Sequence, residues 1–129
     1  MYENKYSQSN ELNKLANEIY QNNLRAGWWP FDDDGLPAPE KRNKGEIIAL
    51  IHSEISEALE GVRKNKQDDH LPHRKSEEVE LADAVVRILD YAGAFNLDIG
   101  GALAEKTLYN QKRSDHKLEN RAKEGGKRF

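Results

Sequence analysis

Cysteine is absent from this chain of 129 residues, and so are long apolar runs. Without cysteine the chain has neither disulfides nor thiolate metal ligands, which fits the cytoplasm as its location. No apolar run approaches the roughly 20 residues of a membrane span. The first residues, MYENKYSQSNE, also lack the apolar core of a signal peptide. We therefore expect a cytoplasmic protein with no membrane partner.

An excess of positive charge is also missing, because 20 Lys and Arg residues face 23 Asp and Glu residues and the formal net charge is −3. Domains that bind nucleic-acid polymers are normally basic, so we expect no such partner. The length suggests one domain over residues 1–129. Since 33% of the residues are charged and 36% are hydrophobic, a chain of this size buries little apolar surface alone. We therefore expect a homo-oligomer.

Apolar residues recur at three- and four-residue spacing in four segments, which predicts an all-α fold, a helical bundle of about four helices. The expected helices span residues 7–25, 46–64, 76–96 and 102–115, with Ser76 as the N-cap of the third. Residues 97–101 are expected to form a break, and the polar, Gly-rich residues from about 118 to 129 a mobile tail. A long loop, residues 27–45, carries three of the four prolines together with Trp28 and Trp29. These two side chains call for burial or a ligand.

Two acidic pairs stand on two of the predicted helices. Glu54 and Glu57 read E-x-x-E, and Glu80 and Asp83 read E-x-x-D. Residues three apart are neighbours on a helix surface, so each pair presents two carboxylates side by side. Four carboxylates meeting between two largely apolar helices would be costly to bury without a cation. The pattern therefore predicts a site for a hard divalent metal, Mg²⁺ or Mn²⁺.

The types of ligand narrow the choice of metal and substrate. The E-x-x-H motif of di-iron helical bundles is missing. The spacing of an EF-hand calcium loop is missing as well, and DDDG at residues 32–35 is too short for one. Mg²⁺ held by carboxylates keeps positions open for water and phosphate oxygens, so a polyphosphate substrate is expected. The chain has no G-x-x-x-x-G-K-[ST] motif, which excludes a P-loop protein.

Several other charged or polar residues of the third and fourth predicted helices have more than one possible role. Arg87 and Asp90 share a narrow stripe of the third helix with the acidic pair, so a structural ion-pair network, in which Arg87 bonds Asp83 and Asp90, is the alternative to a metal site. On the fourth helix Lys106, Asn110 and Arg113 share one face and are candidates to hold phosphates. For Arg113, a role in complementing the dipole at the end of the helix is the alternative.

The ordered set of motifs resembles the MazG-like nucleoside triphosphate pyrophosphohydrolases, the wider group of which includes helical dUTPases and dCTPases. The likeness covers roughly residues 43–117 and rests on SEISEALEG, ELADAVVRILDYA and KTLYNQKRSDHK. The resemblance implies a four-helix MazG-like domain that hydrolyses an NTP or dNTP to the monophosphate and pyrophosphate. The single-domain build and the GWWP segment look most like phage-type members, which would place the protein in a host cytoplasm. The MazZ-like branch of these would make (d)GTP the substrate.

The resemblance also implies roles for particular residues. Glu54, Glu57, Glu80 and Asp83 would bind two to three Mg²⁺ or Mn²⁺ ions and perform the catalysis. Lys106, Asn110 and Arg113 would contact the phosphates, and Trp28 and Trp29 would lie against the base. Family members form homodimers or homotetramers. A non-catalytic helical oligomer with a regulatory or assembly role is the alternative function.

Overall fold

The computed structural model describes residues 2–113 and 118–126. This part of the chain is helical and contains no strand, which confirms the all-α prediction. Four long helices account for most of it. A 3₁₀ turn lies between the first and second of them, and a short helix follows the fourth. These elements are α1 (Tyr2–Arg25), η1 (Pro39–Lys41), α2 (Lys44–Lys64), α3 (Ser76–Ala94), α4 (Ile99–Lys112) and α5 (Leu118–Arg121).

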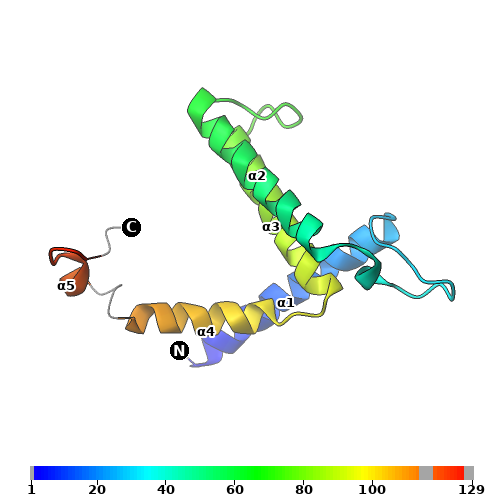
Figure 1. Ribbon diagram of the computed structural model, residues 1–129, viewed down its shortest axis with the longest axis horizontal. Helices are drawn as coiled ribbons and strands as arrows, with labels where there is room; N and C mark the ends of the chain where they lie inside the picture. The colour runs from blue at the N-terminus through cyan, green and yellow to red at the C-terminus, as the bar shows by residue number, and fades with distance from the viewer. Residues whose placement is uncertain (1, 114–117, 127–129) are drawn as a thin grey trace. The chain divides into compact units, whose positions relative to one another are not determined.

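The chain divides into two compact units, which we describe separately. The central unit, Lys14–Leu97, contains the second half of α1, the long loop, α2 and α3. The terminal unit combines Met1–Asn13 with Asp98–Phe129. Within the central unit α2 and α3 lie side by side as a helical hairpin (Figure 1). The loop that joins them is closed by an isolated bridge between Gln67 and Lys75.

The α2–α3 hairpin is held in a close, antiparallel arrangement. Asn43 caps the start of α2 by accepting a hydrogen bond from the Glu46 amide at 3.0 Å. Near the other end, a Cβ atom on Gly61 would lie 2.9 Å from the Cβ of Ser76, so the two backbones approach where α3 begins. Glycine is needed at this position because any side chain would push the helices apart.

The core of the central unit is aromatic. Buried Tyr20, Leu24, Trp29 and Ile47 form it, and Tyr91, Ala94 and Phe95 pack against it. The Trp29 ring meets Tyr20 and Phe95 edge-on, with ring centroids 5.7 and 5.9 Å apart. The long loop therefore returns to the helices through Trp29, which anchors it between α1 and α3.

The terminal unit is fastened by the side chain of Asn13. Its Nδ2 donates to Asp98 Oδ1 at 2.7 Å, and its Oδ1 accepts a bond from the Gly100 amide at 2.8 Å. Asp98 in turn caps α4 by accepting a bond from the Gly101 amide. At Gly100 a Cβ atom would lie 2.1 Å from the carbonyl oxygen of Ser9. Only glycine allows α1 and α4 to touch there.

Several predicted boundaries were wrong. The first helix begins at Tyr2, five positions before the predicted start. Ser76 is the first helical residue and is buried, whereas Lys75 takes the N-cap position. The predicted break at residues 97–101 is helical from Ile99 onward, because the Asp98 cap and the contact at Gly100 compensate for two consecutive glycines. Residues 114–117, the predicted end of the fourth helix, lie outside the described residues.

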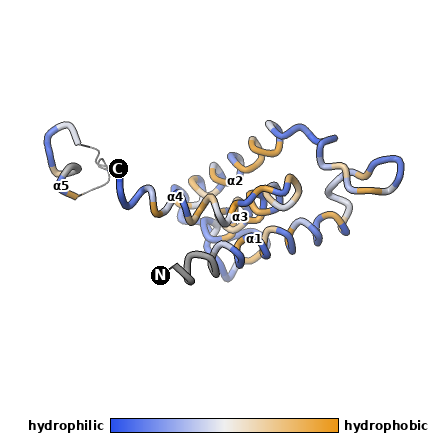
Figure 2. The backbone as a smooth tube through the Cα atoms, turned by 90° about the horizontal axis from the view of Figure 1, so that it is seen from below, coloured by the Kyte–Doolittle hydropathy of each residue, from blue (hydrophilic) through white to orange (hydrophobic). Residues whose placement is uncertain are grey.

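Helix α3 is not buried on all sides, although its sequence is largely apolar. Leu81, Val85 and Ile88 are 38–52% exposed, and apolar residues of α2 are exposed as well. Figure 2 shows hydrophobic residues recurring along both helices. The hairpin is thus covered by the chain on some of its sides only.

Candidate metal centre

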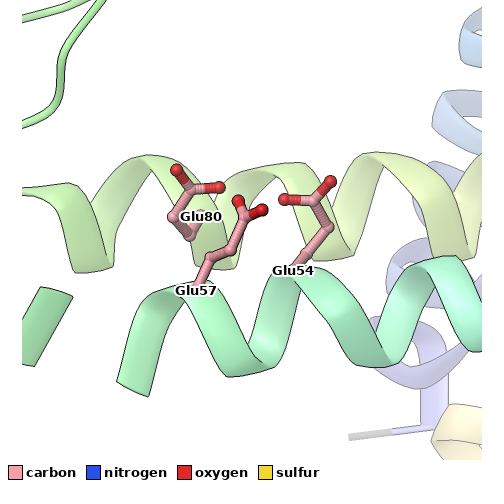
Figure 3. Close-up of side chains that lie close together, drawn as sticks. All are labelled: Glu54, Glu57 and Glu80. Atoms are coloured by element: carbon pink, nitrogen blue, oxygen red, sulfur yellow. The ribbon is translucent and has the colours of Figure 1, made fainter. Parts of the chain in front are cut away.

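Three carboxylates meet where α2 and α3 run side by side. Glu54 and Glu57 come from α2 and Glu80 from α3 (Figure 3). Each offers an oxygen, and these oxygens all lie within 4.8 Å of one another. The structure thus brings together three of the four residues that the acidic pairs singled out. We call this group the acidic cluster.

The helical repeat explains the geometry of the acidic cluster. Glu54 and Glu57 are three residues apart and therefore share one side of α2. The antiparallel hairpin sets Glu80 opposite them on α3. The three side chains differ in exposure: Glu54 is buried, Glu80 is half-buried and Glu57 is exposed. One end of the acidic cluster is therefore open to solvent, and the other lies against the packed helices.

The electrostatics of the acidic cluster are unfavourable when all three groups are charged. The pKa of Glu80 is raised from 4.5 to about 7. Burial is the largest cause, and the closeness of Glu54 and Glu57 adds to it. A carboxyl group with this pKa holds its proton over part of the neutral range, and a cation between the three groups would release that proton.

Asp83 lies beside the acidic cluster, outside the set of three. Burial raises its pKa, and so does the charge of Glu54, whereas Arg87 lowers it. The charges of Asp68 and Glu57 also raise it. Asp83 therefore lies in the same negative field as the acidic cluster, and the charge of Arg87 opposes that field.

Arg87 bonds neither of the two partners that the ion-pair alternative gave it. Its Nε donates to Glu54 Oε1 at 2.9 Å, between a half-exposed arginine and a buried carboxylate. The ion-pair alternative had placed this guanidinium between Asp83 and Asp90, on its own helix. The observed bond joins α3 to α2 instead, and the charge of Arg87 offsets part of the rise that burial causes in the pKa of Asp83 and of Asp90.

A cavity of about 430 Å³ opens beside the acidic cluster. Glu54, Asp83 and Arg87 form its charged wall. Polar and apolar groups from α1, the long loop and both hairpin helices form the rest, and the complete lining is Asn23, Trp28, Arg42, Leu50, Glu54, Asp83, Val86, Arg87 and Asp90. The cavity is of the size that takes a small molecule.

The two neighbouring tryptophans occupy different environments. Trp28 is 71% exposed and lines the cavity. Trp29 is 2% exposed, and its indole N–H donates to Asp90 at 2.9 Å. The Arg42 guanidinium lies over the Trp29 ring, 4.7 Å from its centroid. Trp28 therefore presents a free ring to the cavity, whereas Trp29 is a core residue.

The predicted phosphate-contacting residues belong to the terminal unit, so the acidic cluster is assembled without them. Lys106 is exposed, with its Nζ 4.8 Å from the centroid of the Tyr109 ring. Arg113 caps the end of α4, 5.9 Å from the same ring centroid. The Oδ1 atom of Asn110 is buried and accepts no hydrogen bond among the described residues. That oxygen is the one orphaned acceptor found in this part of the chain.

Asn23, Arg42 and Asp68 were not among the site residues expected from the sequence. The first two line the cavity, and Asn23 offsets part of the rise that burial causes in the pKa of Asp90. Asp68 is buried and accepts bonds from the amides of His70 and Leu71. An Asp in a polar, proline-containing connection, where its side chain can bond the backbone amide two residues on, is a detectable signal for Asp68, whereas no local pattern marks the other two.

Comparison with protein-family models, with curated proteins and with solved structures gives no match to this chain. Within the described residues, none of the helices combines the length and the apolar character that crossing a membrane requires.

Proposed function

We propose that the chain is a Mg²⁺- or Mn²⁺-dependent nucleoside triphosphate pyrophosphohydrolase that converts a (d)NTP to the monophosphate and pyrophosphate. The observation that carries the proposal is the meeting of Glu54, Glu57 and Glu80, with oxygens within 4.8 Å of one another. Oxygen-only donors suit Mg²⁺ and Mn²⁺. The raised pKa of Glu80 supports the same reading, because burial and the neighbouring carboxylates both oppose its charged form, and a divalent cation would favour that form.

The proposed role of each carboxylate follows from its exposure and its partners. Glu54, Glu57, Glu80 and Asp83 would hold two to three ions, which supply charge neutralisation for a triphosphate and a more acidic water. Glu57 is the exposed member of the acidic cluster and is best placed to accept the proton of the attacking water, because Glu54 is engaged by Arg87. Water adds to phosphorus as the α–β anhydride bond breaks, which yields the monophosphate, pyrophosphate and a proton.

The cavity is the proposed place for the nucleoside. The exposed Trp28 ring offers a stacking surface on its wall, and Asn23 and Asp90 offer polar groups for a base edge. These groups suit the edge of a nucleobase in general, and (d)GTP is proposed as the substrate because the resemblance to the MazZ-like branch implies it. Lys106, Asn110 and Arg113 would contact the phosphates, within a homodimer or homotetramer of a MazG-like, phage-type enzyme.

The first experiment is a panel of the eight common NTPs and dNTPs with Mg²⁺ or Mn²⁺, with products separated by chromatography. We expect monophosphate and pyrophosphate without diphosphate, and the fastest turnover with a guanine nucleotide. Diphosphate as the first product would contradict cleavage between the α and β phosphates. No turnover of any nucleotide by folded protein would remove the proposal.

Matched variants connect the activity to the acidic cluster. Glu80→Gln and Asp83→Asn should lower kcat by a factor of about 10² or more, because each removes a charge from the proposed ligand set. Glu60→Gln is the control: Glu60 stands on the same helix, is exposed and bonds Lys64 at 2.8 Å. Equal activity of all three variants would show that the acidic cluster is not the site of the reaction.

A non-catalytic helical oligomer is the second candidate, and the Arg87–Glu54 ion pair favours it. That bond already provides one carboxylate of the acidic cluster with a counter-charge. This candidate predicts that 5 mM Mg²⁺ leaves the melting temperature unchanged and that no nucleotide binds. Isothermal titration of Mn²⁺ into wild type and Glu80→Gln separates the two functions without any measurement of turnover.

A further inference from the structure

Two arginines line the cavity beside the acidic cluster. Arg42 comes from the end of the long loop and Arg87 from α3. Both belong to the central unit, whereas the residues that were predicted to contact phosphates belong to the terminal unit. We propose that Arg42 and Arg87 form an oxyanion site, which holds the phosphate group that stays attached to the nucleoside. The inference rests on the proposed function in one respect only, that the cavity takes a nucleotide.

Arg87 is fixed at the base of its guanidinium group, and its outer nitrogens are left for a ligand. Its Nε donates to Glu54 Oε1 at 2.9 Å, and the arginine side chain is 41% exposed. A guanidinium group carries N–H donors on all three of its nitrogens. Within the described residues, the Nη1 and Nη2 atoms of Arg87 donate no hydrogen bond. The bond to Glu54 therefore orients the side chain while its planar fork remains available to an anion.

Arg42 is held in a different way and keeps the same capacity. Its backbone amide donates to the Pro39 carbonyl at 3.0 Å, and the next residue, Asn43, caps α2. Its guanidinium lies over the Trp29 ring, 4.7 Å from the centroid. Among the residues that the structure describes, the half-buried side chain of Arg42 has neither a hydrogen-bond acceptor nor an ion-pair partner. A cation–π contact leaves the N–H groups without an acceptor, so an anion can bind them.

The order of residues along α3 indicates which phosphate the site would hold. Asp83, Arg87 and Asp90 all line the cavity and share one side of the helix. At about 1.5 Å per residue, Asp83 and Asp90 are about 10 Å apart along the helix axis. Asp83 marks the end beside the acidic cluster, and Asp90, which accepts the bond from Trp29, marks the other end. Arg87 lies between them, where a nucleotide with its base near Asp90 and its outer phosphates at the acidic cluster would place its α-phosphate.

The two guanidinium groups lie near a common point of the cavity. Burial raises the pKa of Asp90, and the charges of Arg42 and Arg87 each offset part of that rise. Both groups are therefore close enough to one carboxylate to act on the same ligand. Arginine binds a phosphate through two parallel N–H···O bonds, and the terminal oxygens of a phosphate monoester can accept bonds from two arginines. We therefore expect the monophosphate product, which has three terminal oxygens, to bind in the cavity.

A purely structural role is the alternative for both arginines. Arg87 provides a counter-charge for buried Glu54, and Arg42 covers the ring of Trp29. Under that alternative, a substitution lowers the stability of the chain but changes the affinities for a nucleoside and for its monophosphate by the same factor. An oxyanion site predicts that only the monophosphate loses affinity. The ratio of the two affinities therefore separates the alternatives.

Isothermal titration of the full chain with the common nucleosides and deoxynucleosides and with their 5′-monophosphates, in Mg²⁺, measures this ratio. We expect the best monophosphate to bind about 100-fold more tightly than its nucleoside, because hydrogen bonds from arginine to phosphate are charge-assisted. Arg42→Gln and Arg87→Gln should each reduce that ratio about tenfold. Arg63→Gln is the control and should leave it unchanged, because the Arg63 side chain is 72% exposed on α2 and lies 3.9 Å from Glu60.

Arg42→Lys and Arg87→Lys cover the case in which a glutamine variant unfolds, because lysine keeps the charge and loses the fork. Each should reduce the ratio by less than glutamine does, with unchanged helix content by circular dichroism. The absence of monophosphate binding, an equal affinity for nucleoside and monophosphate, or a ratio that all four variants leave intact would overturn the inference. Preferential binding of a monophosphate without turnover of any triphosphate would uphold the oxyanion site and remove the proposed hydrolysis. Turnover together with an unchanged ratio in the variants would do the reverse.

Discussion

Replacing Glu80 by glutamine should make the metal-free protein more stable at alkaline pH. The pKa of Glu80 is raised from 4.5 to about 7 in the folded chain. In the unfolded chain the group ionises near its ordinary value, so folding becomes less favourable as the pH rises from about 4.5 to about 7. Below 4.5 the group is protonated in both states and the penalty is absent. Above 7 the penalty is complete.

The magnitude follows from the size of the shift. A rise from 4.5 to about 7 corresponds to about 3 kcal/mol of free energy at full strength. Glu80 is half-buried and one end of the acidic cluster meets solvent, so screening reduces this to about 1–2 kcal/mol. Glutamine has the shape of the protonated acid and carries no charge. At pH 8 the variant should therefore exceed wild type by that amount, and the two should be equal near pH 4.5.

Urea unfolding in EDTA, followed by circular dichroism at several pH values, measures the difference. Mg²⁺ added at pH 8 should then stabilise wild type more than the variant, because the variant has lost a carboxylate ligand. Glu60→Gln serves as the control and should show no gain at any pH. A Glu80→Gln variant that is no more stable than wild type at pH 8 would refute the electrostatic account of the acidic cluster.

Three further substitutions test the hairpin and the core. Gly61→Val should cost about 1–3 kcal/mol in urea unfolding, because the new side chain meets Ser76 where the helices approach; an unchanged midpoint would show that the helices can separate freely. Trp29→Phe removes the donor to Asp90 and should cost about 2 kcal/mol in urea unfolding. In a chain that already carries Asp90→Ala, the same substitution should cost less, because the acceptor is then missing. Arg87→Gln leaves a buried carboxylate without its counter-charge and should destabilise the metal-free chain by about 1–2 kcal/mol. Added Mg²⁺ should reduce that loss, and an equal loss with and without the ion would argue against a cation at the acidic cluster.

Patterns local in sequence predicted the hairpin well. Residues 46–64 and 76–96 were expected to be helical, and α2 and α3 span Lys44–Lys64 and Ser76–Ala94. The meeting of Glu54, Glu57 and Glu80 was predictable for the same reason. Three-residue spacing fixes the neighbours on one helix, and the short connection makes the next helix an antiparallel partner.

Features that depend on contacts between distant residues could not be read from the sequence. Trp28 and Trp29 are adjacent and chemically alike, and only the position of Asp90 and the surrounding rings decides which one is buried. The bond from Arg87 to Glu54 depends on the rotation of one helix against the other. A break was predicted at residues 97–101 because two consecutive glycines disfavour a helix. The Asp98 cap and the contact of Gly100 with Ser9 make the glycine pair acceptable there.

The two hydrogen bonds of the Asn13 side chain have a consequence for the order of folding during biosynthesis. Its partners, Asp98 and the Gly100 amide, are separated from it by 85 and 87 residues. A ribosome that adds about 5–20 residues per second needs roughly 4–17 s to make the intervening chain. The central unit is contiguous and complete before α4 begins. The first half of α1 must therefore wait without its partner, and the terminal unit is the last part of the nascent chain to close.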